Sequence, residues 1–441
     1  MAYTTNLTIP GMAAGRFIPK HIVPTLPATE IKRLYSPELS YRLQAVSNMS
    51  RVLKGAAVRS EGNRPMGNHF HSWESWGPGS ASALAVFSAA NNLQVTGIVD
   101  HYSVRGFGEF RAACDTLGVL STCGYEMRAL VRDKMMCGDV DLSKTVINSP
   151  GNPGEAYIVF HGVVPGQNQF LALARADKTE RYRQVVEKLN QLLEGKTAER
   201  LNFEDILATR TQGDNVLDRH ITDALFDLLH TDAKGDFAGI FDRIGSWWGI
   251  ITTKEEQALL SAETAYSRYI AATGMLRSRL LQRDKPAYVM PSEIECPPLE
   301  YLSAIAREEG SLLVYPYLGT EDAYLDEHVE LMQRLGFDAI SGMPNRNTED
   351  QTARIRSLSQ QAGLPYISGM DVNNLTQDWI DVPWSFDPEL INTALMLVGH
   401  EFAVKNGMGG FNSPSISRAF PRLSDRIAHF VNVARTSQIL D

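Results

Sequence analysis

The sequence is poor in cysteine and carries no basic run. Its four cysteines, Cys114, Cys123, Cys137 and Cys296, form no CxxC pair among the 441 residues, which argues against a structural zinc knuckle. They lie in or beside apolar segments, so we expect reduced core cysteines. The formal net charge is -9 and no basic stripe interrupts it, which argues against a duplex nucleic-acid partner.

Signals for membranes and for common nucleotide or serine chemistry are also lacking. No apolar run approaches the roughly 20 residues that span a bilayer, so we expect no membrane partner. Residues 1–24 lack a cationic start followed by an apolar stretch, which makes a poor signal peptide and predicts a cytoplasmic protein. GxGxxG, GxxxxGK[ST] and GxSxG motifs are absent, which argues against dehydrogenases, P-loop kinases and serine hydrolases.

The order of predicted elements indicates an α/β fold with an insertion. Hydrophobic residues make up 44% of the chain, which is ordinary for a globular protein. Alternating strands and helices in two separate stretches predict a parallel α/β layer or barrel, whereas the stretch between them has helical periodicity. The expected segments are an N-terminal arm or cap (1–62), the first part of the barrel (63–164), a helical insertion (165–296), the second part of the barrel (297–375) and a C-terminal helical extension (376–441).

Five predicted strands each end in a side chain that binds metals. His69 and His71 form an HxH pair, and residues two apart on a strand point to the same side, so both imidazoles can reach one ion. The other strand ends carry His101, Glu126, His161 and Asp371. Because the carboxyl ends of parallel barrel strands meet on one face, we expect these side chains to converge. Imidazole with carboxylate suits zinc, manganese or iron.

The same segments resemble the motifs of the PHP (polymerase and histidinol phosphatase) superfamily. HFHSWESWGPG, VTGIVDHYSVRGFGEFRAAC and LGVLSTCGYEM are similar to its opening HxHS, TDH and GxE segments, in the same order. YIVFHGVV, SLLVYPYLG and YISGMDVNN stand where the family has later strands ending in histidine, AHPG and GSDxH. The resemblance covers residues 63–375.

This resemblance implies a distorted seven-stranded (β/α) barrel that holds one to three divalent ions and hydrolyses a phosphate ester. Carried over by position, a first ion would be held by His69, His71, Glu126 and Asp371. His101 and Glu126 would serve a second ion, and His161 a third. On the same grounds, His101, Glu126 and His161 are the expected catalytic residues.

The sequence departs from the family pattern at three ligand positions. The family's ligand in the loop after HxH falls on Gly77 or Pro78, neither of which binds through its side chain. The histidine of AHP falls on Tyr315, and the last histidine of GSDxH falls on Asn373. Tyrosine and asparagine oxygens bind zinc more weakly than imidazole does. We therefore expect fewer ions, a harder metal such as manganese or iron, or a changed reaction, with Tyr315 also a candidate for substrate binding.

Arg219 and His220 are candidates for binding substrate. They lie in a predicted helix that resembles the family's phosphate-contacting RxH segment, although Asp218 occupies the position of the family's arginine. A guanidinium there would suit a phosphate through bidentate hydrogen bonds. The alternative is an ordinary helical surface pair.

These observations favour a metal-dependent phosphoesterase that acts on a small phosphorylated metabolite or nucleotide through a metal-bound hydroxide. Two other hypotheses stay open. The HxH pattern also serves amidohydrolases, so a C–N or C–O bond of a metabolite is a second possible target. The third hypothesis is a non-catalytic, metal-binding regulatory module, motivated by Tyr315 and Asn373. The sequence carries no signal for the oligomeric state, and fold resemblance alone does not fix a function.

Overall fold

The computed structural model divides into two compact units. One is formed by Leu173–Glu295, and the other by the described residues of Ala14–Ala172 and Cys296–Asp441. No described helix is long and apolar enough to cross a bilayer. The structure describes residues 26–57, 66–77, 79–164, 166, 168–234, 237–254, 256, 258, 265–344, 346–371 and 388–437.

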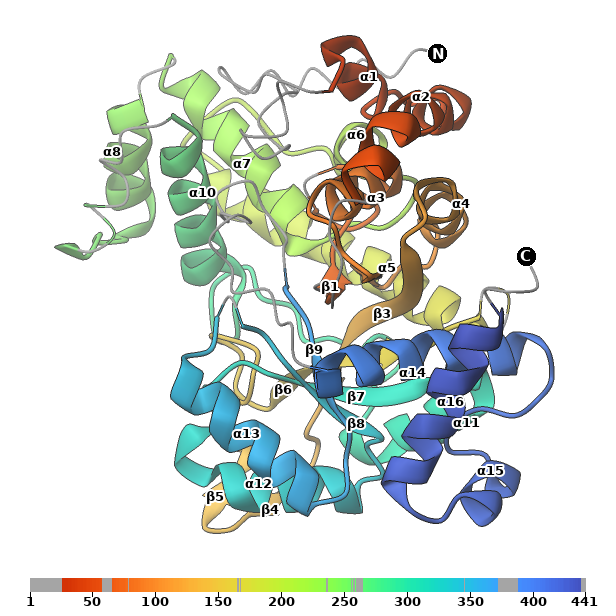
Figure 1. Cartoon of the computed structure of the whole chain (residues 1–441). Coiled ribbons are helices and arrows are strands. Elements are labelled where there is room, and N and C mark those ends of the chain that lie inside the picture. The colour runs from red at the N-terminus through yellow and green to blue at the C-terminus, as the bar shows by residue number, and fades with distance from the viewer. Residues whose placement is uncertain are drawn as a thin grey trace. The chain divides into compact units, whose positions relative to one another are not determined.

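The larger unit is built on a seven-stranded sheet in the order β1-β2-β3-β6-β7-β8-β9 (Figure 1). The outermost strands β1 and β9 contact each other, and the Asn68 side-chain amide donates to the Ser368 carbonyl at 3.3 Å, so the sheet is nearly closed. This confirms the predicted distorted (β/α) barrel. The strands are β1 (Met66–Phe70), β2 (Val95–His101), β3 (Leu120–Leu130), β6 (Glu155–His161), β7 (Leu312–Tyr317), β8 (Ala339–Gly342) and β9 (Tyr366–Ser368).

One strand runs against the others. β6 is antiparallel to both neighbours, β3 and β7, whereas all remaining pairs are parallel. The expectation of parallel strands was therefore wrong for this segment. β3 also continues past Glu126 to Leu130. The connection from β3 to β6 has no crossover helix: it consists of a two-stranded ribbon, β4 (Met136–Cys137) and β5 (Val140–Asp141), followed by η2 (Leu142–Lys144). A connection without such a crossover returns the chain antiparallel.

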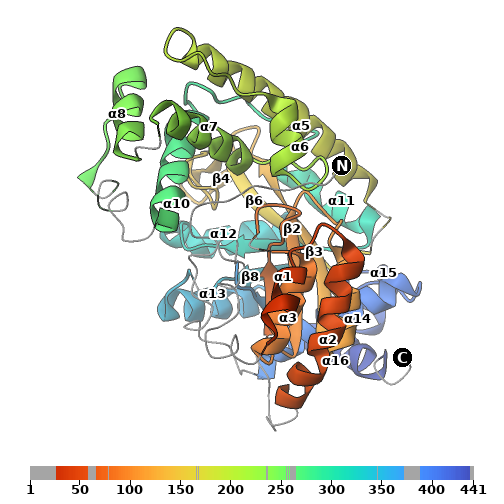
Figure 2. The ribbon, with the colours of Figure 1, turned by 90° about the horizontal axis from the view of Figure 1, so that it is seen from above.

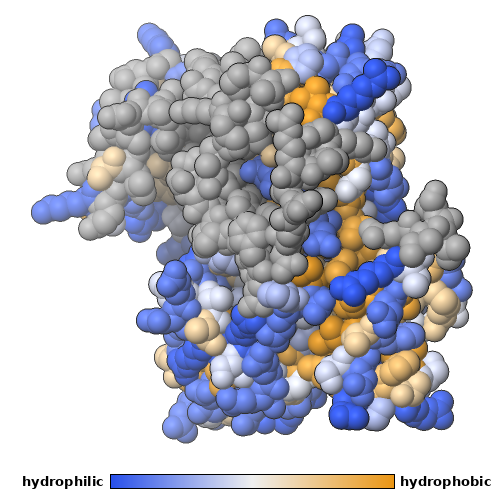
Figure 3. Space-filling model, viewed as in Figure 1, coloured by the Kyte–Doolittle hydropathy of each residue, from blue (hydrophilic) through white to orange (hydrophobic). Residues whose placement is uncertain are grey.

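Helices surround this sheet. α2 packs on α3 (Figure 2) and on α4. The Arg42 guanidinium forms a buried two-point ion pair with Glu109 of α4 at 2.8 and 2.6 Å. The amphipathic helices α12 and α13 present the hydrophilic surface at the lower left of Figure 3. The helices are α1 (Ala28–Arg33), α2 (Leu39–Ala57), α3 (Ala81–Ala90), α4 (Phe107–Leu117), η4 (Leu299–Tyr301), α11 (Leu302–Glu309), η5 (Asp322–Tyr324), α12 (Leu325–Arg334), α13 (Glu349–Gln361), α14 (Pro388–Lys405), α15 (Pro414–Ala419) and α16 (Leu423–Ser437).

The barrel core is closed at one end by α14. This helix contacts β1, β2, β3 and β9, and Glu401 on it accepts a hydrogen bond from the backbone of Cys123, near the start of β3. It therefore lies at the amino-terminal ends of these strands and leaves their carboxyl ends for the site.

All four cysteines are buried and free, as predicted. The core combines Val99, Val159, Leu312, Val314, Ala339 and Ile367 of the strands with Met396, Leu397, Ala403, Phe411 and Phe430 of the C-terminal segment.

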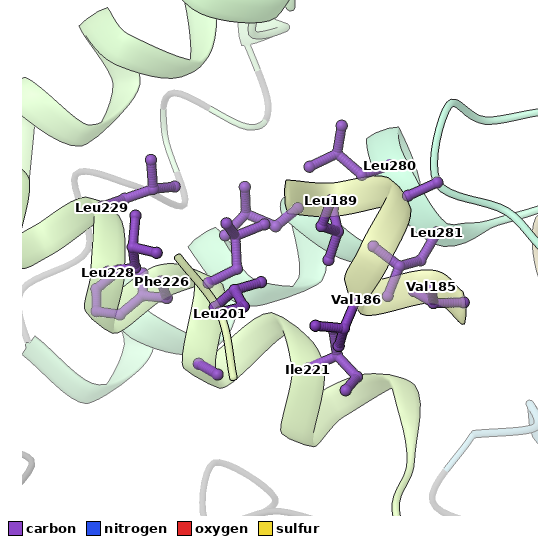
Figure 4. Close-up of a cluster of buried hydrophobic side chains, with 14 of the residues drawn as sticks. Val185, Val186, Leu189, Leu201, Ile221, Phe226, Leu228, Leu229, Leu280 and Leu281 are labelled. Atoms are coloured by element: carbon purple, nitrogen blue, oxygen red, sulfur yellow. The ribbon is translucent and has the colours of Figure 1, made fainter. Parts of the chain in front are cut away.

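The second unit is helical and has its own core (Figure 4). Inside it the Arg181 guanidinium forms a buried two-point ion pair with Glu295, at 2.5 and 2.6 Å, and the Lys178 ammonium donates to the Asn215 amide oxygen at 2.6 Å. Its core includes Val185, Val186, Leu189, Ile221, Leu228 and Leu280. Its helices are α5 (Gln169–Leu193), α6 (Phe203–Arg210), α7 (Asp218–Asp232), α8 (Phe237–Trp248), α10 (Ala265–Leu276) and the π-helical turn η3 (Arg277–Leu281).

The crossing of α14 and α16 depends on a glycine, which gives a stability prediction. A methyl group added at Gly399 would lie 1.9 Å from the Phe430 carbonyl oxygen. We expect Gly399→Ala to lower the free energy of unfolding by about 1–3 kcal/mol, because two helix backbones must separate. Gly108→Ala on α4 is the matched control, because nothing lies within 4 Å of its added methyl. Its effect should range from neutral to about 1 kcal/mol stabilising. Urea unfolding followed by circular dichroism measures both, and equal midpoints would contradict the close crossing.

Candidate metal centre

Four of the predicted ligands meet around one carboxylate oxygen. Glu126 Oε2 lies 3.0 Å from His101 Nδ1, 3.7 Å from His71 Nε2 and 3.8 Å from His69 Nε2. The ligand atoms of His69, His71 and Glu126 all lie within 4.8 Å of one another. Glu126 therefore stands between the imidazoles of β1 and that of β2, which is where a bridging carboxylate would stand.

Asp371 completes the cluster from the segment after β9. Its Oδ1 lies 3.4 Å from His71 Nε2, while its Oδ2 forms an ion pair with Arg346 at 2.6 Å. The backbone of Asp371 has φ +35°, a conformation that costs energy for any residue other than glycine. One carboxylate oxygen thus faces the histidines while the other is held by a guanidinium from the loop after β8.

A bulge in β1 accompanies the HxH pair. The register between β1 and β2 shifts between Gly67 and Phe70, so that Asn68 and His69 share the space opposite Gly97. Such bulges re-aim side chains beside active sites. Gly97 is needed here, because a Cβ on it would lie 2.7 Å from the Asn68 carbonyl oxygen.

The loop after His71 is tied to β2 by Asp100. Its carboxylate accepts hydrogen bonds from the Ser72 backbone, the Ser72 hydroxyl and the Ser75 hydroxyl, each at 2.7 Å. Gly77 closes the same loop against the His71 carbonyl, with no room for a side chain. Because Asp100 bonds the residue next to His71 and itself precedes His101, one carboxylate fixes the positions of both imidazoles.

The donor set fits a divalent cation. Both ring nitrogens of His69 and His71, and Nδ1 of His161, are buried and have no hydrogen-bond partner among the described residues. A buried polar atom without a partner costs about 1–3 kcal/mol. Ligand atoms that each lie about 2.1 Å from an ion are about 3.0–3.4 Å apart at octahedral or tetrahedral angles. The 3.0–3.8 Å separations in the cluster are close to this range.

Electrostatics favour the same conclusion. Burial alone would raise the pKa of Glu126, but the neighbouring imidazoles, His101 first, hold it below its ordinary value. Burial opposes ionisation of Asp371 as well, yet Arg346 and the imidazoles hold its pKa far below the usual range. For His71, burial lowers the pKa, and the Asp371, Glu126 and Asp100 carboxylates outweigh it and raise the pKa. Two ionised carboxylates therefore lie beside the same histidines and attract positive charge.

His161 lies one step deeper in the barrel. Because β6 is antiparallel, His161 pairs with Gly124 and not with Glu126. A Cβ on Gly124 would lie 3.1 Å from His161 Nδ1, so this glycine makes room for the ring. Burial, assisted by the positive charge on His69 when protonated, lowers the pKa of His161 to about 3. His161 is therefore neutral at pH 7, which is the form that binds metal.

Tyr315 is not brought to this cluster. Alternate residues of a strand face opposite sides, and its neighbour Val314 belongs to the barrel core. The Tyr315 ring lies 4.6 Å from the His328 ring of α12, and its hydroxyl donates to Glu321. The structure thus uses Tyr315 to pack α12 on the sheet. Asn373 lies outside the described residues.

Arg219 and His220 belong to the helical unit, at the start of α7. His220 Nδ1 accepts a hydrogen bond from the Leu217 backbone at 3.1 Å, so this ring caps its own helix. The Arg219 carbonyl accepts from the Thr222 hydroxyl at 3.0 Å, within the same helix. Their contact with substrate stays a prediction.

Sequence reasoning missed Arg346 and Asp100. Asp100 carries a signal, since it directly precedes a candidate ligand and the serines after HxH are natural partners for its oxygens. Arg346 lies in the loop between β8 and α13, which contains no ligand-type motif. Its contact with Asp371 joins two strands' loops, so only the fold brings it into view.

Comparison with known proteins shows the fold. No family model matches the sequence, and no curated protein matches it. A crystal structure from Bifidobacterium adolescentis, provisionally described as a metal-dependent phosphoesterase, has a TM-score of 0.50 at 16% identity and covers 77% of this chain and 98% of its own. The chain shares that fold. An amidohydrolase structure from Chromobacterium violaceum, with bound sulfate and no metal, has a TM-score of 0.47 at 16% identity and covers 70% of this chain and 87% of its own.

The cluster predicts the metal content of the purified protein. We expect near-stoichiometric manganese, iron or zinc in the wild type, and its loss in His71→Ala and Asp371→Ala, because each removes a ligand atom from the Glu126 cluster. Elemental analysis by plasma mass spectrometry measures this. His429→Ala is the control, because this histidine lies on α16 and stacks on Phe420. Equal metal in all four proteins would contradict the assignment of these ligands.

Proposed function

We propose that this chain is a metal-dependent phosphoesterase of the PHP superfamily, acting on a small phosphorylated metabolite or nucleotide. The observation that carries the proposal is the buried cluster of three imidazoles and two carboxylates around Glu126, in which ring nitrogens of His69 and His71 have no hydrogen-bond partner among the described residues. The similar Bifidobacterium structure, provisionally described as a metal-dependent phosphoesterase, supports the same reaction class.

Each ligand has a distinct proposed role. A bound divalent ion would lower the pKa of a coordinated water and polarise a phosphoryl oxygen. His69, His71 and Asp371 would hold it, with Glu126 shared between this position and His101.

His101 and His161 have proposed roles toward the substrate. The His101 side chain is 21% exposed, against 1% for His69 and His71, so it is the imidazole that substrate meets first. His161, kept neutral by burial, would serve as a ligand or a proton acceptor and not as an acid. We also propose cytoplasmic location, a small-molecule substrate in place of duplex nucleic acid, and a helical insertion over residues 165–296.

Hydrolysis of an amide is the second candidate, and it is favoured by the side chains that stand at the family's other ligand positions. His161, expected to hold a third ion, lies one step deeper than the cluster, and Tyr315, which occupies a ligand position of the family, packs on α12. A centre with fewer ions also suits C–N hydrolysis, for which one polarising cation can suffice.

Turnover of model substrates tests the proposal. The metal-loaded protein should hydrolyse p-nitrophenyl phosphate, and removal of the metal by a chelator should abolish this. Glu126→Gln and His101→Ala, assayed at saturating metal, should lower kcat by roughly 100-fold or more, because both change the ligands that face the substrate. His429→Ala should keep wild-type kcat.

The outcomes separate the candidates. Hydrolysis of p-nitroacetanilide with no action on phosphate esters would favour the amidohydrolase. Tight metal binding without turnover of any ester or amide in a broad panel would contradict both and favour a non-catalytic metal-binding module.

A further inference from the structure

An arginine to which the sequence motifs give no role lies on the same face as the metal ligands. Arg128 is two residues beyond Glu126 on β3, and it pairs with Tyr157 of β6 just as Glu126 pairs with Val159. Residues two apart on a strand point to the same side and have Cα atoms about 6.6 Å apart. Arg128 and Tyr157 therefore continue the ligand face one step further along the strand.

The guanidinium is held in a fixed orientation. Arg128 Nη2 donates to the Tyr157 hydroxyl at 3.0 Å, and Nη1 donates to the buried carboxylate of Glu155 at 3.3 Å. The guanidinium carbon lies 5.2 Å from the centre of the Tyr157 ring. The Tyr102 hydroxyl, one residue after His101, accepts a hydrogen bond from the Arg128 backbone at 3.0 Å. A group fixed in this way loses little entropy on binding a ligand.

The pair lies on the accessible flank of the cluster. The Tyr157 ring centre is 5.9 Å from that of His101, the most exposed of the clustered imidazoles. The Arg128 side chain is 13% exposed, and Tyr157 is half-buried. His101, Tyr157 and Arg128 are therefore neighbours that all keep some exposed surface, unlike His69 and His71.

This arrangement suits a ligand with two separated oxyanions. One would lie at the Glu126 cluster, and the other would lie a few bonds away, at the guanidinium. Arginine binds carboxylates and phosphates with two parallel hydrogen bonds, which fixes both position and orientation.

We propose that Arg128, oriented by Tyr157 and Glu155, binds a second oxyanion of the substrate and so selects phosphate esters that carry a further carboxylate or phosphate group. This inference rests on the proposed phosphoesterase function and names its substrate class. The group bound by Arg128 is remote from the scissile bond, so Arg128 is a specificity residue.

Binding of non-hydrolysable phosphonates tests this without requiring turnover. Isothermal titration calorimetry on the metal-loaded protein compares phosphonoacetate, 3-phosphonopropionate and 4-phosphonobutyrate with alkylphosphonates of equal chain length. In the wild type, the added carboxylate should tighten binding by roughly tenfold or more at the best chain length, because it gains a charged hydrogen bond. Replacing it with a second phosphonate distinguishes phosphate from carboxylate as the preferred group.

Substitutions assign the effect to Arg128. Arg128→Ala should remove the preference for the second oxyanion while leaving metal content and alkylphosphonate affinity unchanged. Arg128→Lys should keep part of this preference. Arg128→Gln retains hydrogen-bond donors for Tyr157 and Glu155 without the charge, so it should lose the preference even if Arg128→Ala destabilises the pairing of β3 and β6. Arg132→Ala, an exposed arginine just after β3, is the matched control and should behave as wild type.

The results that would overturn the inference differ from those that would overturn the function. Wild-type protein that binds both ligand series equally would exclude the role of Arg128 and leave the phosphoesterase standing. If Arg128→Gln weakened the binding of both ligand series equally while metal was retained, the role of Arg128 would be structural and the inference would be overturned. Wild-type protein that holds metal yet binds no phosphonate would overturn the phosphoesterase, and this inference with it.

Discussion

Burial of the Glu126 carboxylate is the constraint on which the rest of the site depends. A charged group inside a barrel is destabilising unless positive charge or hydrogen bonds surround it. Here three imidazole nitrogens lie 3.0–3.8 Å from one of its oxygens, and they come from two neighbouring segments of chain. Arg346 offsets the charge of Asp371, and neutral imidazoles leave that of Glu126 unbalanced. The barrel is thus assembled around a negatively charged cluster, and binding of a cation there would stabilise the fold.

The surrounding structure makes room for this cluster by placing glycines where a side chain would clash. Gly97 and Gly124 leave room for the bulged HxH segment and for His161, respectively. At the opposite end of the barrel, α14 closes the core. The His400 ring of this helix lies so near Gly162 that a Cβ on Gly162 would be 2.2 Å from the ring. Burial lowers the pKa of His400 to about 4, so this plug is uncharged at neutral pH. At this end of the barrel the Glu401 carboxylate is paired with Arg111 at 2.6 Å, so the charged group on α14 there has a partner of its own, apart from the Glu126 cluster.

Local patterns predicted the barrel and the side chains that gather at its centre, because strand periodicity and the HxH spacing are properties of neighbouring residues. Contacts between distant segments could not be predicted in this way. The direction of β6 depends on the ribbon that replaces a crossover helix, and it moves His161 down to the level of Gly124. The side to which Tyr315 points is set by its register with β8, so a motif position alone gave it a ligand role that its packing on His328 does not support. Arg346 reaches Asp371 from another strand's loop, and no local signal marks it.

The charged side chains of the site lie both at the Glu126 cluster and beside it, at Arg128. The cluster carries the ionised carboxylates of Glu126 and Asp371, while Arg346 offers one guanidinium against them. A divalent ion added to neutral imidazoles would offset the negative charge of Glu126 and of the neighbouring Asp100. Arg128 lies beyond it on the accessible flank, with its own charge offset by Glu155 at 3.3 Å. A cation held in this way polarises an oxygen atom that contacts it, whether the oxygen belongs to a phosphoryl group or to a carbonyl group. The charges of the described residues thus favour a bound cation at this site, independently of any resemblance in sequence.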